Sequence, residues 1–275
     1  MSAPRHEAVP LVGRTERIVT TTLLWVLAAL TLLPLALIVA KALEAGADAG
    51  GGWTLHNFSR AWEQGRLGRA LVSSAIVSGA IVVLSTTLAT AAAYGIAIIR
   101  PRGAGLIFVL LVLGLLVPFE ALVIPLYYRL QDAGLTNTYW ALILPQSALS
   151  LSFASYWMRG FFLGVPVSVL EAARVEGSSH LRTLLHVVLP MARPAIGTLV
   201  LLNFMWNWNE FLMPLVMISS EDLRTAPLAL AQFQSRYSVD TTAQAAAALV
   251  IAAPILVLYA VLHRRFLAGL TGETR

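Results

Sequence analysis

The chain has 275 residues, of which 58% are hydrophobic and only 12% charged, and its mean hydropathy is +0.76. A water-soluble domain carries roughly a quarter of its residues as charges, so this composition indicates a protein surrounded mainly by lipid. The absence of cysteine excludes disulfides, thiolate metal sites and cysteine nucleophiles. The net charge of +5 comes without a basic cluster or an RNA-binding motif, so no nucleic-acid partner is expected.

Six apolar stretches are each long enough to cross about 30 Å of hydrocarbon as a helix, which takes about 20 residues. We therefore predict an all-α integral membrane protein with six transmembrane helices. The predicted spans are residues 18–40, 70–99, 105–127, 138–158, 195–218 and 243–263. The first apolar run is too long for the core of a secretory signal, so we interpret it as a retained helix.

These spans divide the chain into five predicted parts. Residues 1–17 are an N-terminal segment, 18–40 the first helix and 41–69 a Gly-rich extracytoplasmic loop. A five-helix unit covers 70–263, and a tail covers 264–275. Every span except the second contains proline, whereas the second is rich in small residues, which allow close helix packing.

Arginine and lysine are unevenly distributed between the two sides of the predicted bundle. Twelve lie in the N-terminal segment, the second and fourth loops and the tail, and seven lie on the opposite face together with acidic residues. Because cytoplasmic loops carry an excess of Arg and Lys, both termini and the loop 159–194 are predicted to be cytoplasmic.

The polar stretch VSVLEAARVEGSSHLRTLLHVVLPMARP (residues 167–194) interrupts the apolar chain between the fourth and fifth spans. Ser168 and Glu171 have the spacing of a capping box after Pro166, which predicts a helix that begins near Val169. Gly177 is suited to end this helix in the left-handed conformation.

A second helix is predicted over residues 179–189, because four apolar residues recur there on one helical face. These residues are Leu181, Leu184, Leu185 and Val188. The loop is thus predicted to be a helix–turn–helix on the inner membrane surface. The small side chains of Ala172 and Ala173 would let the backbone of a partner protein approach closely. The alternative is an amphipathic helix pair that rests only on lipid.

The stretch EAARVEGSSHLRTLLHVVLP resembles the EAA loop in the membrane subunits of binding-protein-dependent ABC importers. The matching residues are Glu171, Ala172, Ala173, Gly177, Leu189 and Pro190. Glu176 stands where the family usually has Asp, and Ser178 stands where it has Ala. Three further stretches, at residues 118–145, 206–230 and 264–275, are similar to the carbohydrate-importing branch, and in particular to the smaller membrane subunit of maltose-type importers.

This resemblance implies a type I ABC importer permease fold with a cytoplasmic coupling helix between helices 4 and 5. The implied ATPase-coupling residues are Glu171, Ala172, Ala173, Glu176 and Gly177. The implied partners are a second permease subunit that completes a heterodimer, a cytoplasmic ABC ATPase dimer, an extracytoplasmic solute-binding protein, a sugar and the lipid of a bacterial cytoplasmic membrane.

The chain itself has no sequence for binding ATP. A phosphate-binding loop requires a lysine followed by Ser or Thr, and the only lysine, Lys41, is followed by Ala42. We therefore expect no cofactor and no enzymatic activity on this chain, with ATP and Mg²⁺ bound by the partner ATPase.

Glu120 and Glu210 are the carboxylates within the predicted spans. A charge at the centre of a membrane helix costs about 2.5–3.5 kcal/mol on insertion scales, so each is expected to face a cavity or the bundle interior. Aromatic faces with amide or carboxylate groups suit a sugar. The candidate substrate-pathway residues are Glu120, Gln146, Asn203, Trp206, Asn207 and Glu210, of which the last four share a helical face. The alternative is that these polar groups hold helices together and that the tryptophans lie at a membrane interface.

The sequence therefore predicts the permease subunit of a sugar ABC importer. An ABC importer permease for another solute stays open as an alternative. An ion-coupled secondary transporter is less favoured, because that class is typically built from inverted repeats and this chain shows no internal repeat.

Overall fold

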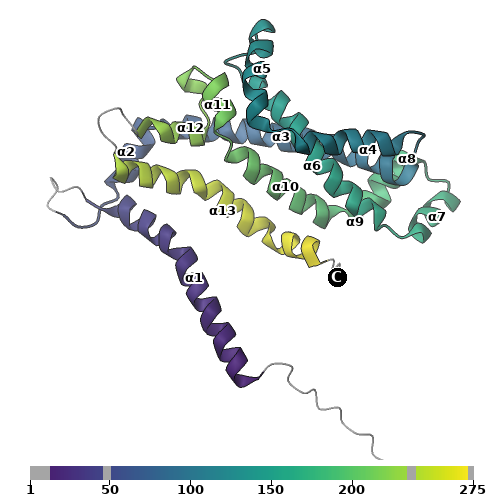
Figure 1. Cartoon of the computed structure of the whole chain (residues 1–275), viewed down its shortest axis with the longest axis horizontal. Coiled ribbons are helices and arrows are strands. Elements are labelled where there is room, and N and C mark those ends of the chain that lie inside the picture. Colours follow the sequence, from purple (N-terminus) through teal and green to yellow (C-terminus); the bar gives the residue numbers. More distant parts are fainter. Residues whose placement is uncertain (1–12, 46–50, 234–239, 272–275) are drawn as a thin grey trace, which may run out of the picture.

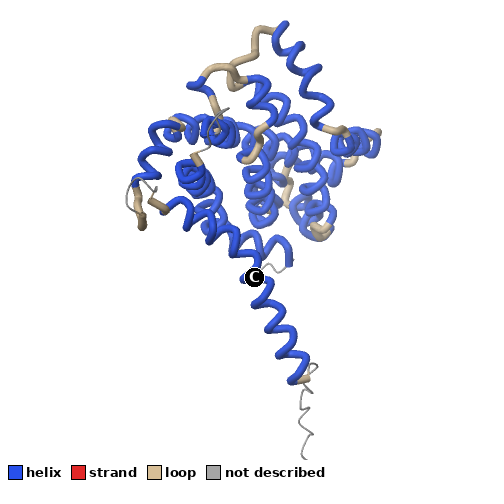
Figure 2. The backbone as a smooth tube through the Cα atoms, turned by 60° about the vertical axis from the view of Figure 1, so that its left-hand side comes forward, coloured by secondary structure: helices blue, strands red, loops and turns tan. Residues whose placement is uncertain are grey.

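The computed structural model describes residues 13–45, 51–233 and 240–271. All regular elements in these ranges are helices (Figures 1 and 2), which confirms the all-α prediction. Three helices are long and apolar enough to cross a membrane, and the number rises to six if each of three bent helix pairs is one span. Residues 1–12 of the predicted N-terminal segment, 46–50 of the loop and 272–275 of the tail lie outside the described ranges.

Four of the predicted spans correspond to one long helix each. They are α1 (Arg14–Leu43), α3 (Leu67–Tyr94, continued by a π-helical turn at Gly95–Ile99), α6 (Trp140–Leu163) and α13 (Thr241–Thr271). The helical conformation of α13 continues to Thr271, past the predicted start of the tail at residue 264. The shorter helices are α2 (His56–Gln64), α4 (Ala104–Leu113), α5 (Phe119–Asp132), α7 (Val167–Val175), α8 (His180–Thr183), α9 (Leu189–Met191), α10 (Arg193–Trp208), α11 (Leu212–Met217) and α12 (Ala226–Leu230).

Two of the predicted spans, both of which contain proline, consist of two helices with a break between them. The span 105–127 consists of α4, a 3₁₀ turn at Gly114–Leu116, and α5, which is bent away by 97°. Pro118 has extended backbone at this bend and immediately precedes α5. The span 195–218 consists of α10 and α11 with a break between them. In a continuous helix the ring of Pro214 would clash with the carbonyl of Glu210, whereas proline is tolerated in the first turn of α11.

The central helix is α3, which packs against α6, α10 and α12. Many of its buried side chains are small, which lets neighbouring helices approach closely; these include Ser73, Ser74, Ser78, Ser85, Ala89 and Ala93. The Ser74 hydroxyl also accepts a hydrogen bond of 2.8 Å from the Ala226 N–H at the start of α12. The small residues of this span therefore lie at its contacts with neighbouring helices, as predicted.

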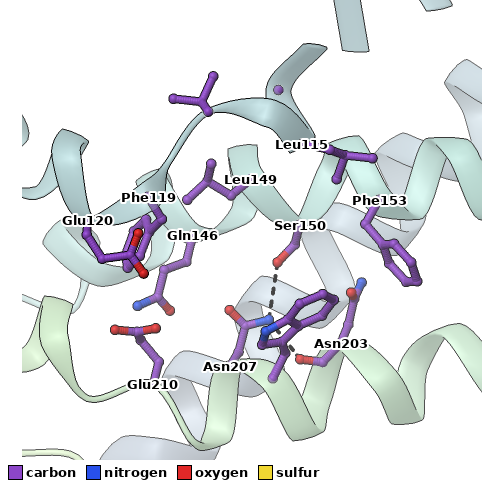
Figure 3. A pocket seen from close by; sticks show the side chains of 13 residues that line it. Leu115, Phe119, Glu120, Gln146, Leu149, Ser150, Phe153, Asn203, Asn207 and Glu210 are labelled. Atoms are coloured by element: carbon purple, nitrogen blue, oxygen red, sulfur yellow. Dashed lines mark hydrogen bonds between the residues drawn. The ribbon is translucent and has the colours of Figure 1, made fainter. Parts of the chain in front are cut away.

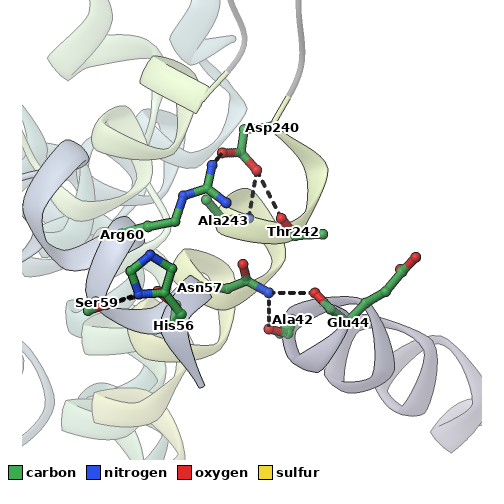
Figure 4. A network of polar contacts seen from close by, with 9 residues as sticks. All are labelled: Ala42, Glu44, His56, Asn57, Ser59, Arg60, Asp240, Thr242 and Ala243. Carbon is green, nitrogen blue, oxygen red and sulfur yellow. Dashed lines mark hydrogen bonds and ion pairs between the residues drawn. The ribbon is translucent and has the colours of Figure 1, made fainter. Parts of the chain in front are cut away.

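The first helix is attached to the others only near its C-terminal end, where Ala42 is buried against α13. Residues 15–40 are exposed, and Figure 1 shows α1 diverging from the bundle toward its N-terminal end. At its other end the Asn57 side chain on α2 donates hydrogen bonds of 2.9 Å to the carbonyls of Ala42 and Glu44 (Figure 4). On the same helix Arg60 pairs with Asp240, which caps the start of α13. Helix α2 therefore joins the end of α1 to the start of α13.

We expect Asn57→Ala to lower the free energy of unfolding by about 1–3 kcal/mol, because it leaves the buried Ala42 carbonyl without its partner. Thermal unfolding of the purified protein in detergent measures this change. Ser59→Ala is the matched control on the same helix, since the Ser59 side chain is exposed and bonds only within α2. Equal melting temperatures for the two variants would contradict the role of α2.

Candidate functional site

A cavity of about 330 Å³ lies between the α4–α5 bend, α6 and α10 (Figure 3). This volume is in the range of small-molecule binding pockets. Most of the lining comes from two sets of residues with the helical spacing i, i+3, i+4 and i+7. Helix α6 contributes Gln146, Leu149, Ser150 and Phe153. Helix α10 contributes Asn203, Trp206 and Asn207, and Glu210 follows two residues after its end. Glu120 comes from the first turn of α5. The structure thus brings together all six predicted substrate-pathway residues, and their role in transport stays a prediction.

Both carboxylates of the cavity lie at helix breaks. Glu120 is in the first turn of α5, and Glu210 lies between α10 and α11. Glu210 Oε1 accepts a hydrogen bond of 3.0 Å from the Met213 N–H. A carboxylate is stabilised at a helix N-terminus by the unpaired N–H groups and the helix dipole. The breaks therefore provide positions that tolerate negative charge and also face the cavity.

The two asparagines of α10 hold the helices around the cavity together. Asn203 Nδ2 donates to the Ser85 hydroxyl of α3 at 3.3 Å. Asn207 Nδ2 donates to the Ser150 hydroxyl of α6 at 3.2 Å and to the Asn203 carbonyl at 2.8 Å. For these two side chains the alternative interpretation, in which polar groups join helices, describes what the hydrogen bonds do.

Gln146 is different from the asparagines. Its side chain is only 4% exposed, and neither amide atom has a hydrogen-bond partner in the described part of the chain. An unpaired buried amide costs roughly 1–3 kcal/mol, so such groups occur where another function requires them. The side chain lines the cavity, where a bound molecule can supply the missing partners.

The two neighbouring tryptophans of α10 have different environments. Trp206 is 66% exposed at the cavity, and its ring packs edge-on against Phe153 with centroids 5.7 Å apart. Trp208 is buried, and its Nε1 donates a hydrogen bond of 3.1 Å to the Ile251 carbonyl on α13. Trp206 therefore offers an aromatic face to the cavity, while Trp208 fixes α10 on α13.

Gly114 is a cavity residue that sequence reasoning missed. It lies at the end of α4, and a Cβ atom there would come within 2.4 Å of Ser152 Oγ on α6. A side chain at this position would displace the Ser152 hydroxyl, so glycine favours the close approach of α4 and α6 at the cavity wall. Its backbone is ordinary helix, so the only sequence signal was a glycine inside an apolar run.

We expect Gly114→Ala to displace the Ser152 hydroxyl, change the shape of the cavity wall and lower transport severalfold. The double variant Gly114→Ala/Ser152→Ala is expected to recover most of the loss, because the hydroxyl is gone and the nearest remaining atom, the Cβ of residue 152, is 3.4 Å away. Initial uptake rates in proteoliposomes measure both effects. Failure of the second substitution to restore uptake would contradict a steric role for Gly114.

The hairpin between α6 and α10 begins with α7 and turns at Gly177. Gly177 has φ +74°, its N–H donates to the Arg174 carbonyl and the Ser178 N–H donates to the Ala173 carbonyl, both at 2.9 Å. This pattern is a Schellman motif, so the prediction of a left-handed stop is confirmed. The predicted capping box is wrong. Helix α7 begins at Val167, directly after Pro166 and without a side-chain cap, so Ser168 is already within its first turn.

The predicted coupling residues do not all face outward. Glu171, Ala172, Glu176 and Gly177 are exposed, whereas Ala173 is 5% exposed and faces the interior of this chain. The prediction that both alanines are accessible to a partner protein is therefore wrong for Ala173. Of the two, only Ala172 is exposed. The helical repeat explains the difference, because consecutive residues point about 100° apart.

The second arm of the hairpin is a helix with an irregular centre. The Ser179 side chain caps α8 by accepting from the Arg182 N–H at 3.4 Å. A π-helical turn at Leu184–Val188 then leads into α9, which ends at Met191. The predicted single apolar stripe is wrong, because Leu184 and Val188 are buried but Leu181 and Leu185 are exposed. The wider π turn shifts which residues share a face.

Bent apolar helices around a cavity with carboxylates and amides, together with a polar hairpin joining two of the cavity helices, define a helical membrane transport subunit. The chain belongs to the family described as "binding-protein-dependent transport system inner membrane component", whose model matches residues 85–270. It is therefore an inner-membrane permease subunit of the ABC transporter class.

Individual relatives agree with this assignment. The chain is 34% identical over 218 residues to the probable ABC transporter permease protein YurM of Bacillus subtilis, which covers 79% of this chain and 72% of that protein. It is 32% identical over 224 residues to the diacetylchitobiose uptake system permease protein NgcG of Streptomyces coelicolor, covering 81% and 74%. It is 31% identical over 220 residues to the trehalose transport system permease protein SugB of Mycobacterium tuberculosis, covering 79% and 80%.

A solved structure shows the same fold. It is a bacterial ABC transporter described as involved in import of the acidic polysaccharide alginate, with a TM-score of 0.79 and 21% identity over 94% of this chain and 100% of that chain. The predicted importer-permease fold is confirmed. At this level of identity the likeness concerns the fold alone.

Proposed function

We propose that this chain is the permease subunit through which a bacterial ABC importer moves a mono- or oligosaccharide across the cytoplasmic membrane. The observation that carries the proposal is the cavity, where two carboxylates and an exposed tryptophan meet a buried amide that has no hydrogen-bond partner among the described residues. Amide and carboxylate groups suit hydroxyls, and an aromatic face suits the C–H surface of a sugar ring. Relatives named for diacetylchitobiose and trehalose support the same cargo class.

The hairpin provides a physical route from an ATPase to the cavity. One end of it continues from α6 and the other end leads into α10, the two helices whose faces line the cavity. A buried cluster that includes Tyr94, Phe162, Leu184 and Val188 packs the hairpin against α3, α6 and α10. A protein that pulls on α7 would therefore move both cavity helices as rigid bodies.

The partner that pulls on α7 is proposed to be a cytoplasmic ABC ATPase dimer, which binds the ATP and Mg²⁺. The exposed surface of the hairpin combines Glu171 and Glu176 with the apolar residues Val175, 89% exposed, and Leu181, 67% exposed. This mixture suits a protein interface, which combines apolar contacts with a polar rim. We further propose a heterodimer with a second permease subunit and delivery of the sugar by an extracytoplasmic solute-binding protein.

Reconstitution with candidate partners tests the function directly. We expect proteins purified in mild detergent to contain an ATPase and a second permease, and proteoliposomes loaded with ATP to take up sugar only when a solute-binding protein is supplied. ATP-dependent uptake of an amino acid or phosphate, with no sugar uptake, would favour the alternative of a non-sugar importer. Sugar uptake driven by an ion gradient without ATP would contradict the proposal.

The proposed orientation places both termini and the hairpin in the cytoplasm. The chain has no cysteine, so single cysteines can be introduced and labelled without interference. In intact cells we expect a membrane-impermeant thiol reagent to label Ser219→Cys, near the opposite end of α6, and not Val175→Cys on α7. Labelling of Val175→Cys from outside would overturn this orientation.

A further inference from the structure

The charge of the cavity is unbalanced. The residues that line it include Glu120 and Glu210 but, within the described ranges, no Lys, Arg or His. Neither carboxylate takes part in an ion pair in the described part of the chain. Figure 3 shows both carboxylates directed into the same space beside the Gln146 amide. A molecule that enters this space therefore meets negative charge that is not neutralised by the surrounding side chains.

The amide of Gln146 is the independent sign that this space holds a ligand. Its side chain is 4% exposed, it lines the cavity, and neither its nitrogen nor its oxygen has a hydrogen-bond partner among the described residues. The NH₂ group donates and the carbonyl oxygen accepts, which matches a hydroxyl group that can do both. By contrast, Asn203 and Asn207 in the same cavity are already bonded to Ser85 and Ser150.

We propose that Glu120, Gln146 and Glu210 form a saccharide subsite that admits neutral and amino sugars and excludes sugars bearing a carboxylate. This inference rests on the proposed function. Two carboxylates that have no ion-pair partner in the described structure attract an ammonium group and repel a third carboxylate, and the effect is stronger at the half-buried Glu210 than at the exposed Glu120. Hydroxyl groups of a neutral sugar donate to the carboxylates and exchange hydrogen bonds with Gln146. The solved structure of similar fold is described as involved in import of an acidic polysaccharide, so the shared fold does not itself set this selectivity.

The test is a binding measurement on the intact transporter with its partner subunits, in lipid nanodiscs and without the solute-binding protein, so that receptor selectivity cannot mask the cavity. The probes are three disaccharides of one length: cellobiose, the glucosamine disaccharide and the galacturonate disaccharide. By isothermal titration calorimetry at pH 6, where the amino sugar is charged, we expect the glucosamine disaccharide to bind at least about tenfold tighter than the galacturonate disaccharide. Higher salt should narrow this difference because ions screen the charges.

The isosteric variant Glu120→Gln/Glu210→Gln removes the charge while an amide oxygen can still accept from the Met213 N–H. We expect it to reduce the affinity ratio of the two charged probes to less than about threefold. Glu221→Gln, an exposed glutamate outside the cavity, should leave the ratio as it is. Equal affinities in the native transporter, a ratio unchanged in the double variant, or no binding of any probe would overturn the subsite. A different result would contradict the proposed function itself, namely the absence of ATP-dependent sugar uptake in the complete reconstituted system.

Discussion

Gly177→Val is expected to lower ATP-driven uptake by tenfold or more while the protein still inserts in the membrane. Gly177 has φ +74°, and the left-handed conformation costs an L-residue roughly 1–2 kcal/mol and is especially unfavourable for a β-branched one. Opening the turn between α7 and α8 relieves this strain. The exposed side of α7 would then no longer be held in a fixed direction relative to α6 and α10. Uptake and ATP hydrolysis, measured together in proteoliposomes, should show hydrolysis that continues without transport.

Two other variants distinguish the effect of the left-handed turn from the effect of replacing any glycine. Gly177→Asn should keep much of the uptake, because asparagine tolerates the left-handed conformation better than other residues with a side chain. Gly160→Ala, on α6, should have no effect on uptake, since its added Cβ meets open space in an ordinary helix. Native uptake by Gly177→Val, or equal losses at both glycines, would show that the turn does not couple the hairpin to transport.

The sequence predicted the positions that local chemistry determines. Gly177 was identified as a left-handed stop because glycine adopts positive φ without a steric cost, whatever its neighbours are. The shared face of Asn203, Trp206 and Asn207 follows from the helical repeat, which holds up to the end of α10, and Glu210, two residues beyond that end, still lines the same cavity. The small residues of α3 indicated a closely packed helix for the same reason, since side-chain size limits how near two helices can come.

The features that the sequence did not predict depend on contacts between distant segments. Hydropathy alone does not distinguish a straight span from the α4–α5 bend, because both are apolar over the same length. The close contact at Gly114 is made by Ser152, which is 38 positions away in the chain, and the burial of Ala173 comes from the packing of α7 on its own protein. The π turn at Leu184–Val188 likewise changed a face that the regular repeat had predicted.

Gln146→Leu is expected to change stability and transport in opposite directions. The substitution replaces a buried amide that has no partner in the described structure by an apolar side chain, so the free energy of unfolding should rise by about 1 kcal/mol or more. If the amide binds sugar hydroxyls, uptake should fall by about tenfold or more, which corresponds to about 1.4 kcal/mol. Thermal unfolding and initial uptake rates on the same preparation measure both changes. A group that only held helices together would lose stability when removed.

Matched positions make this test sharper. The Ser147 hydroxyl is also buried and unpaired in the described structure but does not line the cavity, so Ser147→Ala should stabilise the protein without affecting uptake. Asn203 lines the cavity but donates to Ser85, so Asn203→Leu should destabilise it. The combination of increased stability and impaired uptake is therefore expected at Gln146 alone among these three positions. If Gln146→Leu were less stable than the native chain, or transported normally, the amide would belong to the packing of the bundle, and the cavity would have lost its main evidence for a ligand.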